Sequence, residues 1–349
     1  MRWEVAFSRD VCAGGRRGRR TLADVFQSMI LQLAGFLVPA TILAILALGL
    51  NLQWGHTGLF NAGVAAFVGV GAYTFGMFAT GKYSNPGVSW YHWGPDRPID
   101  MIAAALVAMA VAGIFGLLVA APTLRLRADY LAIATLALAE IVRLVLKNER
   151  RFTGGDQSLA FIPRPFEAFV PGNIGWASDG LFIFIVAGVA LGVVVVLEYV
   201  TRAPWGRDLR AIREDEEAAI ALGKDAFRLK LTAFAIGCAI MGLAGALLAS
   251  FNRVLVPDLF VPASTFTAYV VVILGGSGNN RGVVLGAYLF YVFGWSTQQV
   301  RGYLPPDWSL RLDFINQIVV GVLLILVILF RPEGVLPEKK YVPRSPRAE

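Results

Sequence analysis

Apolar residues along the chain fall in blocks of about 20, the length that an α-helix needs to cross the hydrocarbon core of a membrane. Six such blocks predict spans at roughly 29–50, 101–121, 129–147, 180–200, 229–250 and 313–330. The strands of a membrane β-barrel would instead alternate apolar and polar residues over about ten positions, and these blocks do not alternate. The pattern predicts an all-α integral membrane protein that crosses the bilayer several times.

Two further apolar stretches, residues 58–81 and 267–294, are crowded with glycine, and the second is broken by the polar insert "SGNNR" at 277–281. Each glycine weakens a helix interior by about 1 kcal/mol, so we expect short or re-entrant segments here. Interrupted apolar segments at corresponding positions of two halves indicate a substrate path in a transporter.

The composition agrees with a membrane protein, because 56% of the residues are hydrophobic and only 16% are charged, against about 25% in a soluble domain. The net charge of +7 fits the enrichment of Lys and Arg in cytoplasmic loops, and nucleic-acid binding is the weaker interpretation of "GGRRGRR". If each Gly-rich stretch enters and leaves on one face, four basic segments share the cytoplasmic face: 1–28, 122–128, 201–228 and 331–349.

The most charged stretch between apolar blocks is "GRDLRAIREDEEAAIALGK", residues 206–224. We expect one helix from Leu209 to Leu222, with Asp208 as its N-cap, Gly223 as its C′ stop and Lys224 at the negative end of its dipole. Burying this charge in lipid would be costly, so the helix must lie in water or against a partner. Apolar residues recur along one edge of it at helical spacing: Leu209, Ile212, Ala219 and Ile220.

Several blocks in family order resemble the permease subunits of branched-chain amino acid (Liv-type) ABC importers, and in particular the longer, second permease of the pair. The signature "EAAIALG" (217–223) lies within the charged stretch. The other blocks are "LALGLNLQWGHTGLFNAGVAAFVGVGAYT" (47–74), "PTLRLRADYLAIATLALAEIVRLVLKN" (122–148), "FTGGDQSL" (152–159), the whole of 204–249, and "VVILGGSGNNRGVVLGA" (271–287).

The resemblance implies that the charged stretch, about 207–224, is the coupling helix that docks into a cleft of an ATP-binding subunit. The residues expected to make this contact are Arg207, Arg210, Arg213, Glu217, Ala218, Ala219 and Gly223. The remaining partners implied are a second homologous permease, two cytoplasmic ATPase subunits, a periplasmic solute-binding protein and the lipid of a bacterial inner membrane. The membrane permease domain itself is expected at 29–330.

The chain carries no nucleotide-binding loop of its own. Such a loop needs G-x-x-x-x-G-K-[ST], and the two Gly-Lys pairs, at 81–82 and 223–224, are followed by Tyr83 and Asp225. ATP and magnesium are therefore expected on the partner ATPase subunits, with no cofactor bound by this chain and no enzymatic activity. The cysteines (Cys12, Cys238) and histidines (His56, His92) lie too far apart in sequence for a metal site.

Polar residues at membrane depth are costly and indicate candidates for a substrate path. They are Asn51, Gln53, His56, Thr57, Asn61, Ser277, Asn279 and Asn280. For each of them an interhelical hydrogen bond or a helix cap is the alternative. Glu140 and Arg143 lie three residues apart within a predicted span and are expected to form a structural ion pair.

Branched-chain or other amino acids are the substrates that the resemblance favours, and urea or short amides are the alternative within the same class. A stand-alone secondary transporter or channel would need ion-coupling acids or a filter element, for which only Glu140 is available in a span. A membrane enzyme would need a metal or nucleophile cluster, which the histidines and cysteines do not supply. The sequence therefore predicts an importer permease.

Overall fold

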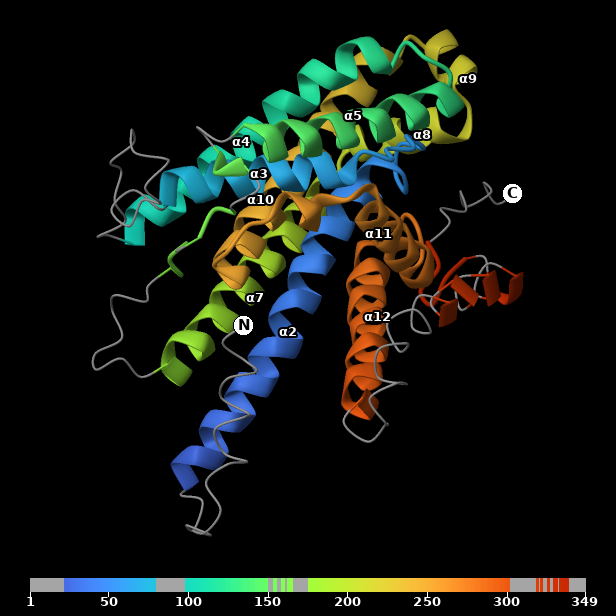
Figure 1. Cartoon of the computed structure of the whole chain (residues 1–349). Helices are drawn as coiled ribbons and strands as arrows, with labels where there is room; N and C mark the ends of the chain where they lie inside the picture. The colour runs from blue at the N-terminus through green and yellow to red at the C-terminus, as the bar shows by residue number, and fades with distance from the viewer. Residues whose placement is uncertain are drawn as a thin grey trace.

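The computed structural model describes residues 22–79, 98–149 and 175–301, together with shorter stretches between 153 and 165 and between 318 and 338. The described residues form helices joined by turns, with one isolated β-bridge between Leu159 and Leu255 (Figure 1). The N-terminal tail to residue 21, Cys12, His92, most of the expected span 313–330 and residues 339–349 lie outside this description.

The principal helices keep the order expected from the apolar blocks. They are α2 (Leu22–Gln53), α3 (Val64–Ala79), α4 (Pro98–Thr123), α5 (Ala128–Asn148), α7 (Gly175–Arg202), α8 (Pro204–Glu214), α9 (Glu216–Ala221), α10 (Ala226–Asn252), η3 (Pro257–Phe260), α11 (Pro262–Gly275) and α12 (Asn280–Arg301).

Four of the described helices are long and apolar enough to cross a membrane: α2, α4, α7 and α10. The prediction of a polytopic helical membrane protein is thereby confirmed. Helix α5 forms where the sequence predicts a span but is not among the four, and it carries charged residues at Asp129, Glu140, Arg143 and Lys147. The Gly-rich stretch 58–81 contains a turn and the short helix α3, rather than a re-entrant hairpin.

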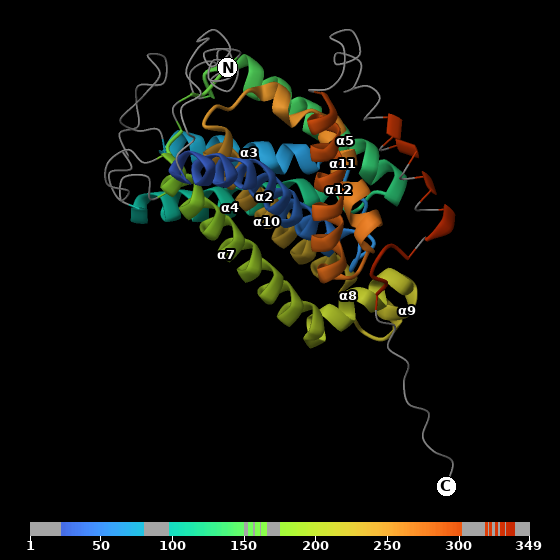
Figure 2. The ribbon, with the colours of Figure 1, turned by 90° about the horizontal axis from the view of Figure 1, so that it is seen from below.

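Helix α10 lies at the centre of the molecule and packs against α2, α3 and α4 (Figure 2). Its glycines meet these neighbours: Gly237 faces Gly49 of α2, and Gly242 faces both Gly71 of α3 and Ala112 of α4. Small residues let membrane helices approach closely enough for their backbones to be in van der Waals contact. The glycine content that the sequence showed is therefore used for helix packing.

The direction of each helix follows from its contacts. Helix α2 runs antiparallel to α12, because Asn51 bonds Asn280 near the start of α12 while Phe36 stacks edge-on against Trp295 further along it. The C-terminal end of α2 therefore lies with α8, at what we call the α8 end, and Leu22 lies at the opposite end (Figure 1). The α11–α12 turn also lies at the α8 end.

The charged stretch between α7 and α10 forms two helices, so the prediction of one helix from Leu209 to Leu222 is wrong. Helix α8 begins with Pro204 in its first turn and ends at Glu214. Asp215 then adopts an extended conformation (φ −154°), and its carboxylate accepts a hydrogen bond from the Ala218 N–H at 3.0 Å. The break follows because Asp215 caps a new helix, as its short acceptor side chain favours.

The predicted stop at Gly223 is confirmed in its conformation, since φ is +82° at this residue. The Lys224 N–H donates to Ala219 O at 3.1 Å, and the Gly223 N–H donates to Ile220 O at 2.9 Å. These two bonds form a Schellman motif, which satisfies the last carbonyls of α9. Asp208 lies inside α8 and does not cap it; its carboxylate pairs with Lys224 Nζ at 3.0 Å.

Candidate functional site

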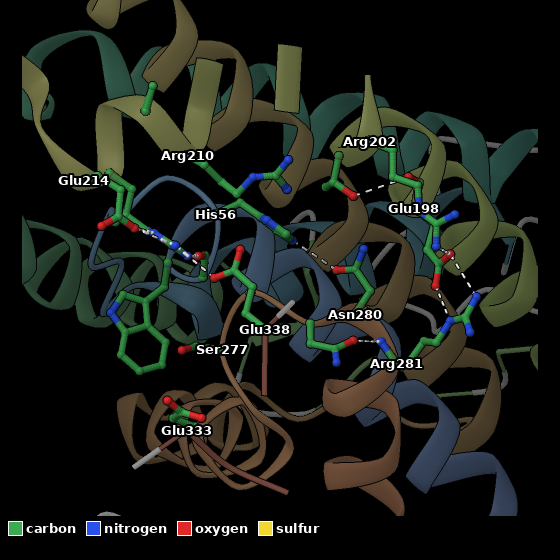
Figure 3. Close-up of a pocket in the computed structure, with 18 residues that line it drawn as sticks. His56, Glu198, Arg202, Arg210, Glu214, Ser277, Asn280, Arg281, Glu333 and Glu338 are labelled. Atoms are coloured by element: carbon green, nitrogen blue, oxygen red, sulfur yellow. Dashed lines mark hydrogen bonds and ion pairs between the residues drawn. The ribbon is translucent and has the colours of Figure 1, made fainter. Parts of the chain in front are cut away.

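A cavity of about 1070 Å³ opens at the α8 end, where segments far apart in the sequence meet (Figure 3). Its wall combines the α2–α3 loop, the end of α7, helix α8, the α11–α12 turn and a C-terminal segment that contains Glu333 and Glu338. Both Gly-rich stretches that the sequence singled out therefore contribute to one polar cavity beside the charged helix.

Asn51 at the end of α2 and Asn280 at the start of α12 join two segments beside this cavity. Asn51 Nδ2 donates to Asn280 Oδ1 at 2.9 Å, and Asn51 Oδ1 accepts a hydrogen bond from the Gly278 N–H at 2.9 Å. Both side chains are buried. Gly55 packs closely against Asn51 and Gly278, in space that a Cβ atom would need. The pairing fixes the α2–α3 loop to the α11–α12 turn.

His56 lies in the α2–α3 loop, beyond the end of α2, and is 2% exposed. Its Nε2 lies 3.4 Å from Asn280 Oδ1, and its Nδ1 has no hydrogen-bond partner among the described residues. Burial is the main cause that lowers the pKa of His56 to about 4; the charges of Arg210 and Arg213 act in the same direction, and the Asn280 hydrogen bond opposes them. His56 is therefore neutral at physiological pH.

Three other candidates for the substrate path lie in the helix core and do not line the cavity. Gln53 Nε2 donates to Phe234 O at 2.8 Å, and Asn61 Nδ2 donates to Gln53 Oε1 at 2.9 Å. Thr57 Oγ1 donates to Leu52 O at 2.9 Å. Buried polar groups need such partners, and these hydrogen bonds are the kind that the structural alternative expects of the three residues.

Asn279 and Ser277 lie at the α11–α12 turn, and both line the cavity. The Asn279 side chain caps α12, because its Oδ1 accepts hydrogen bonds from the Arg281 N–H at 3.1 Å and the Gly282 N–H at 3.4 Å. Ser277 is exposed at the cavity. Of the eight predicted path residues, the structure brings His56, Ser277, Asn279 and Asn280 to the cavity wall, with Asn51 bonded behind them.

Arg213 turns from α8 towards the body of the chain, and it does not face outward as a docking residue would. Its Nη2 lies 2.8 Å from Glu214 Oε1 and 2.9 Å from Glu338 Oε2, and its Nη1 donates to Gly55 O. Burial opposes its charge, but the hydrogen bonds to Glu214 and Glu338 outweigh burial and raise the pKa of Arg213 above its ordinary value. Arg210 also lines the cavity.

Of the four residues on the apolar edge of the charged stretch, Leu209, Ile212 and Ala219 face inward, whereas Ile220 is exposed. Leu209 is buried in the main core, and Ile212 and Ala219 pack with Ala226 and Leu229 at the start of α10. For these three residues, the amphipathic pattern read from the sequence is therefore satisfied within this chain.

The outward face of α9 carries other residues, together with Ile220 of that edge. Leu222 is 81% exposed and Ile220 is 53% exposed, and they lie beside the exposed residues Glu217, Ala218 and Gly223. A Cβ atom placed at Gly223 would meet nothing within 4 Å. Arg207 is exposed on α8. We call Glu217, Ala218, Ile220, Leu222 and Gly223 the α9 surface.

The predicted ion pair of Glu140 and Arg143 is confirmed and is part of a larger group. Arg143 Nη2 lies 2.5 Å from Glu140 Oε1, and Arg143 Nη1 lies 2.7 Å from Asp258 Oδ1 of η3. Lys147 Nζ lies 3.7 Å from the same carboxylate. This group ties α5 to the α10–α11 connection at the end opposite α8, away from the cavity.

Sequence reasoning missed six charged residues of the cavity wall, among them Glu198, Arg281 and Glu338. Arg281 Nε lies 2.5 Å from Glu198 Oε1, joining the start of α12 to the end of α7. An acid near the end of an apolar block was the available signal for Glu198. Glu338 gave none, because its partner Arg213 lies far away in the sequence. The described residues contain no group of three or more His, Cys, Asp or Glu side chains that could hold a metal ion.

Several apolar spans around a polar cavity, with a charged surface helix beside it, define a multi-pass membrane permease. Comparison with known proteins agrees: a family model described as "Branched-chain amino acid transport system / permease component" matches residues 32–328. The chain belongs to this family of branched-chain amino acid transport permeases.

The relatives carry the names of two permeases. The chain is 33% identical over 312 residues to the high-affinity branched-chain amino acid transport system permease protein LivM of Salmonella typhimurium, covering 84% of this chain and 67% of the relative. It is 30% identical to the probable LivM of Methanocaldococcus jannaschii, covering 85% and 91%. Identity to LivH of Salmonella typhimurium is 24%, covering 90% and 97%. The chain is thus more similar to LivM; no solved structure gives a significant match.

Proposed function

We propose that this chain is the transmembrane permease subunit of an ATP-driven importer that carries branched-chain or other small amino acids from the periplasm to the cytoplasm. The observation that carries the proposal is the α9 surface, where Leu222 and Ile220 are exposed at the end of a helix that packs against α10 through Ala219. An exposed apolar group rimmed by charged residues is typical of a protein-binding site. Separate ATPase subunits, with ATP and magnesium, would occupy it.

The geometry supports a mechanical role for α8 and α9. Helix α9 is stiffened by its Asp215 cap and by the Gly223 turn, so it can act as a rigid projection. Helix α8 is continuous with it in the chain and lines the cavity through Arg210 and Arg213. A force applied to α9 by an ATPase would thus reach the cavity wall within one helix length.

The cavity suits a small zwitterion. Arg210 offers a guanidinium group to a carboxylate, and His56, which is neutral, and Asn280 offer uncharged polar atoms. Relatives at about one-third identity are named as branched-chain amino acid permeases, which supports an aliphatic amino acid over urea or a short amide. Asn280, His56, Ser277 and Asn279 are the path residues that we retain.

The proposal also sets the orientation in a bacterial inner membrane. If α9 meets an ATPase, the α8 end faces the cytoplasm together with Glu338 near the C-terminus. The start of α2 then faces the periplasm, because α2 runs to the α8 end. The sequence predicts a cytoplasmic N-terminal tail, most of which lies outside the described part of the chain. The remaining partners are a second, homologous permease, as the LivM and LivH relatives suggest, a periplasmic binding protein and lipid.

The test is docking of co-expressed ATPase subunits to variants of the α9 surface. Leu222→Asp places a charge on a side chain that is 81% exposed, so the fold should survive while the apolar contact is lost. Loss of one buried apolar anchor at an interface weakens binding by roughly 2 kcal/mol or more, or about 30-fold. We expect detergent-solubilised Leu222→Asp to insert normally but to co-purify little ATPase, and Gly223→Val to do the same through its strained φ. Glu217→Ala should have a milder effect.

The matched control is Leu259→Asp, another exposed leucine, which lies on η3 at the opposite end. It should retain the full complement of ATPase. If Leu222→Asp and Gly223→Val also retain wild-type amounts of ATPase and support wild-type uptake, the α9 surface is not the docking site and the proposal is wrong.

A further inference from the structure

A C-terminal segment, residues 333–338, lies against the α11–α12 turn although it is far away in the sequence; we call it the strap. The Val335 N–H donates to Leu274 O at 2.9 Å, and the Leu336 N–H donates to Gly275 O at 3.1 Å. Asn279 Nδ2 lies 3.3 Å from both Leu336 O and Pro337 O. These contacts fix the strap to the broken end of α11 and to the cap of α12.

Glycines on both sides permit this close approach. Gly276 has φ +110°, and the Leu336 and Glu333 carbonyl oxygens occupy the space that its Cβ would need. Gly334 of the strap has φ +74° and packs on the Gly276 backbone in the same way. An L side chain at either position would be strained and would push the strap away. The strap is therefore seated on the turn by a fitted backbone contact.

The strap ends at Glu338, which reaches across to α8. Glu338 Oε2 lies 2.9 Å from Arg213 Nη2, and each side chain is 24% exposed. Arg213 Nη1 also donates to Gly55 O in the α2–α3 loop. Among the described side chains of α8, Arg213 alone is bonded to both the strap and this loop. Figure 3 shows Glu338 between Glu214 on one side and the α11–α12 residues on the other.

We propose that the Arg213–Glu338 pair is a positioning contact that transmits movement of α8 to the α11–α12 turn and so couples ATP hydrolysis to the opening of the substrate path. The inference rests on the proposed function, because it assumes that an ATPase moves α8 through the α9 surface. Arg213 is part of α8 and forms an ion pair with Glu338 of the strap. The strap is in turn bonded to the turn that carries Asn279 and Asn280.

The physical argument depends on charge and burial. A partly buried arginine holds its carboxylate partner at fixed geometry, since separation would leave both charges poorly solvated. Movement of α8 therefore draws Glu338 with it, and the backbone bonds from the strap to Leu274 and Gly275 carry that movement to the end of α11. A series of bonded groups thus connects α8 to the α11–α12 turn, and glutamine at position 338 removes the ion pair in this series while keeping nearly the same side-chain shape.

The test compares Glu338→Gln with Glu214→Gln in the complete transporter, reconstituted with its ATPase subunits in liposomes. Both variants remove one carboxylate from Arg213, but only Glu338→Gln removes the ion pair between the strap and α8. Two quantities are measured: the ATPase retained on the permease, and leucine taken up per ATP hydrolysed. We expect both variants to retain the ATPase, and Glu338→Gln alone to lower uptake per ATP by about tenfold. Glu338→Asp should restore part of the loss.

The result that overturns the proposal is wild-type uptake per ATP in Glu338→Gln. An equal fall in uptake per ATP in Glu214→Gln would overturn it too, because the cause would then be the loss of any carboxylate beside Arg213 and not the loss of the bond to the strap. So would loss of ATPase from Glu338→Gln, since the pair would belong to docking. Failure of the proposed function would give other results: the wild-type chain would retain no ATPase, or the Leu222→Asp variant would retain the wild-type amount.

Discussion

At the scale of single residues, His56 shows how the protein treats a titratable group at the cavity wall. Asn280 Oδ1 already accepts a hydrogen bond from Asn51, so the His56 proton lies on Nε2, directed at the same oxygen. The nearby charged groups are Arg210 and Arg213, and both disfavour a second proton. Burial lowers the pKa of His56 to about 4, against 6.5 for the unfolded chain.

This difference predicts a pH-dependent stability with a definite sign. Between pH 6.5 and 4 the unfolded chain binds a proton at His56 that the native chain does not bind, so the free energy of unfolding falls as the pH falls. The loss amounts to about 3 kcal/mol across this window. Melting of the detergent-solubilised protein should be compared between wild type and His56→Gln. The wild type should lose more stability on acidification than the variant; parallel pH profiles would contradict the assignment.

At the scale of elements, the packing of α10 explains why the chain needs so many glycines. Gly71 of α3 lies against the Gly242 backbone of α10, and a Cβ at Gly71 would overlap the Gly242 backbone. Gln53 of α2 also holds α10 in place, because its Nε2 donates a hydrogen bond to Phe234 O of α10. By contrast, Gly188 of α7 has open space around its Cβ direction. Glycine is thus required at some helix contacts and dispensable elsewhere.

Two alanine substitutions test this distinction. Gly71→Ala forces α3 away from α10, and overpacking of this kind costs roughly 1–3 kcal/mol. Gly188→Ala adds the same methyl group without a clash and should be neutral, or stabilising by about 0.5–1 kcal/mol through helix propensity. The melting temperatures of the two detergent-solubilised variants provide the comparison. Equal effects of the two substitutions would show that the α3–α10 contact is not sterically limited.

The helices also show how much of the fold could be predicted from the sequence. Apolar blocks located α2, α4, α7 and α10 to within several residues, because helix length in a membrane is set by hydrocarbon thickness. The break at Asp215 was missed, although Asp is a favoured N-cap residue, because acidic residues occupy every position from 214 to 217 and the hydrophobic spacing continues through them. Ile212 and Ala219, on either side of the break, both pack on the start of α10, and this contact is not visible in the sequence.

The candidate site, too, could be predicted from the sequence only in part. Sequence reasoning located His56, Asn279 and Asn280, since polar residues that interrupt apolar segments are visible without a structure. It could not separate them from Gln53 and Asn61, which have the same composition signal but bond to each other in the core. Whether a buried amide lines a cavity or fills the core depends on its neighbours in the folded chain, and those neighbours cannot be identified from the sequence alone.

At the scale of the whole molecule, two features at the α8 end face in opposite directions. The α9 surface points outward with Leu222 exposed, while Arg213 and the strap point inward and hold the cavity wall. The family model spans residues 32–328, so the strap at 333–338 lies beyond the matched region. We therefore propose that the α9 surface docks the ATPase and that the strap transmits the movement of α8.

The measurement that tests the central claim most directly is leucine uptake by purified protein in liposomes. The permease, its homologous partner, the ATPase subunits and the binding protein are reconstituted together or with the ATPase left out. We predict uptake that requires both ATP and the ATPase subunits, with no ATP hydrolysis by this chain alone. Robust ATP hydrolysis by the isolated chain, or leucine uptake driven by an ion gradient without ATPase subunits, would contradict the account.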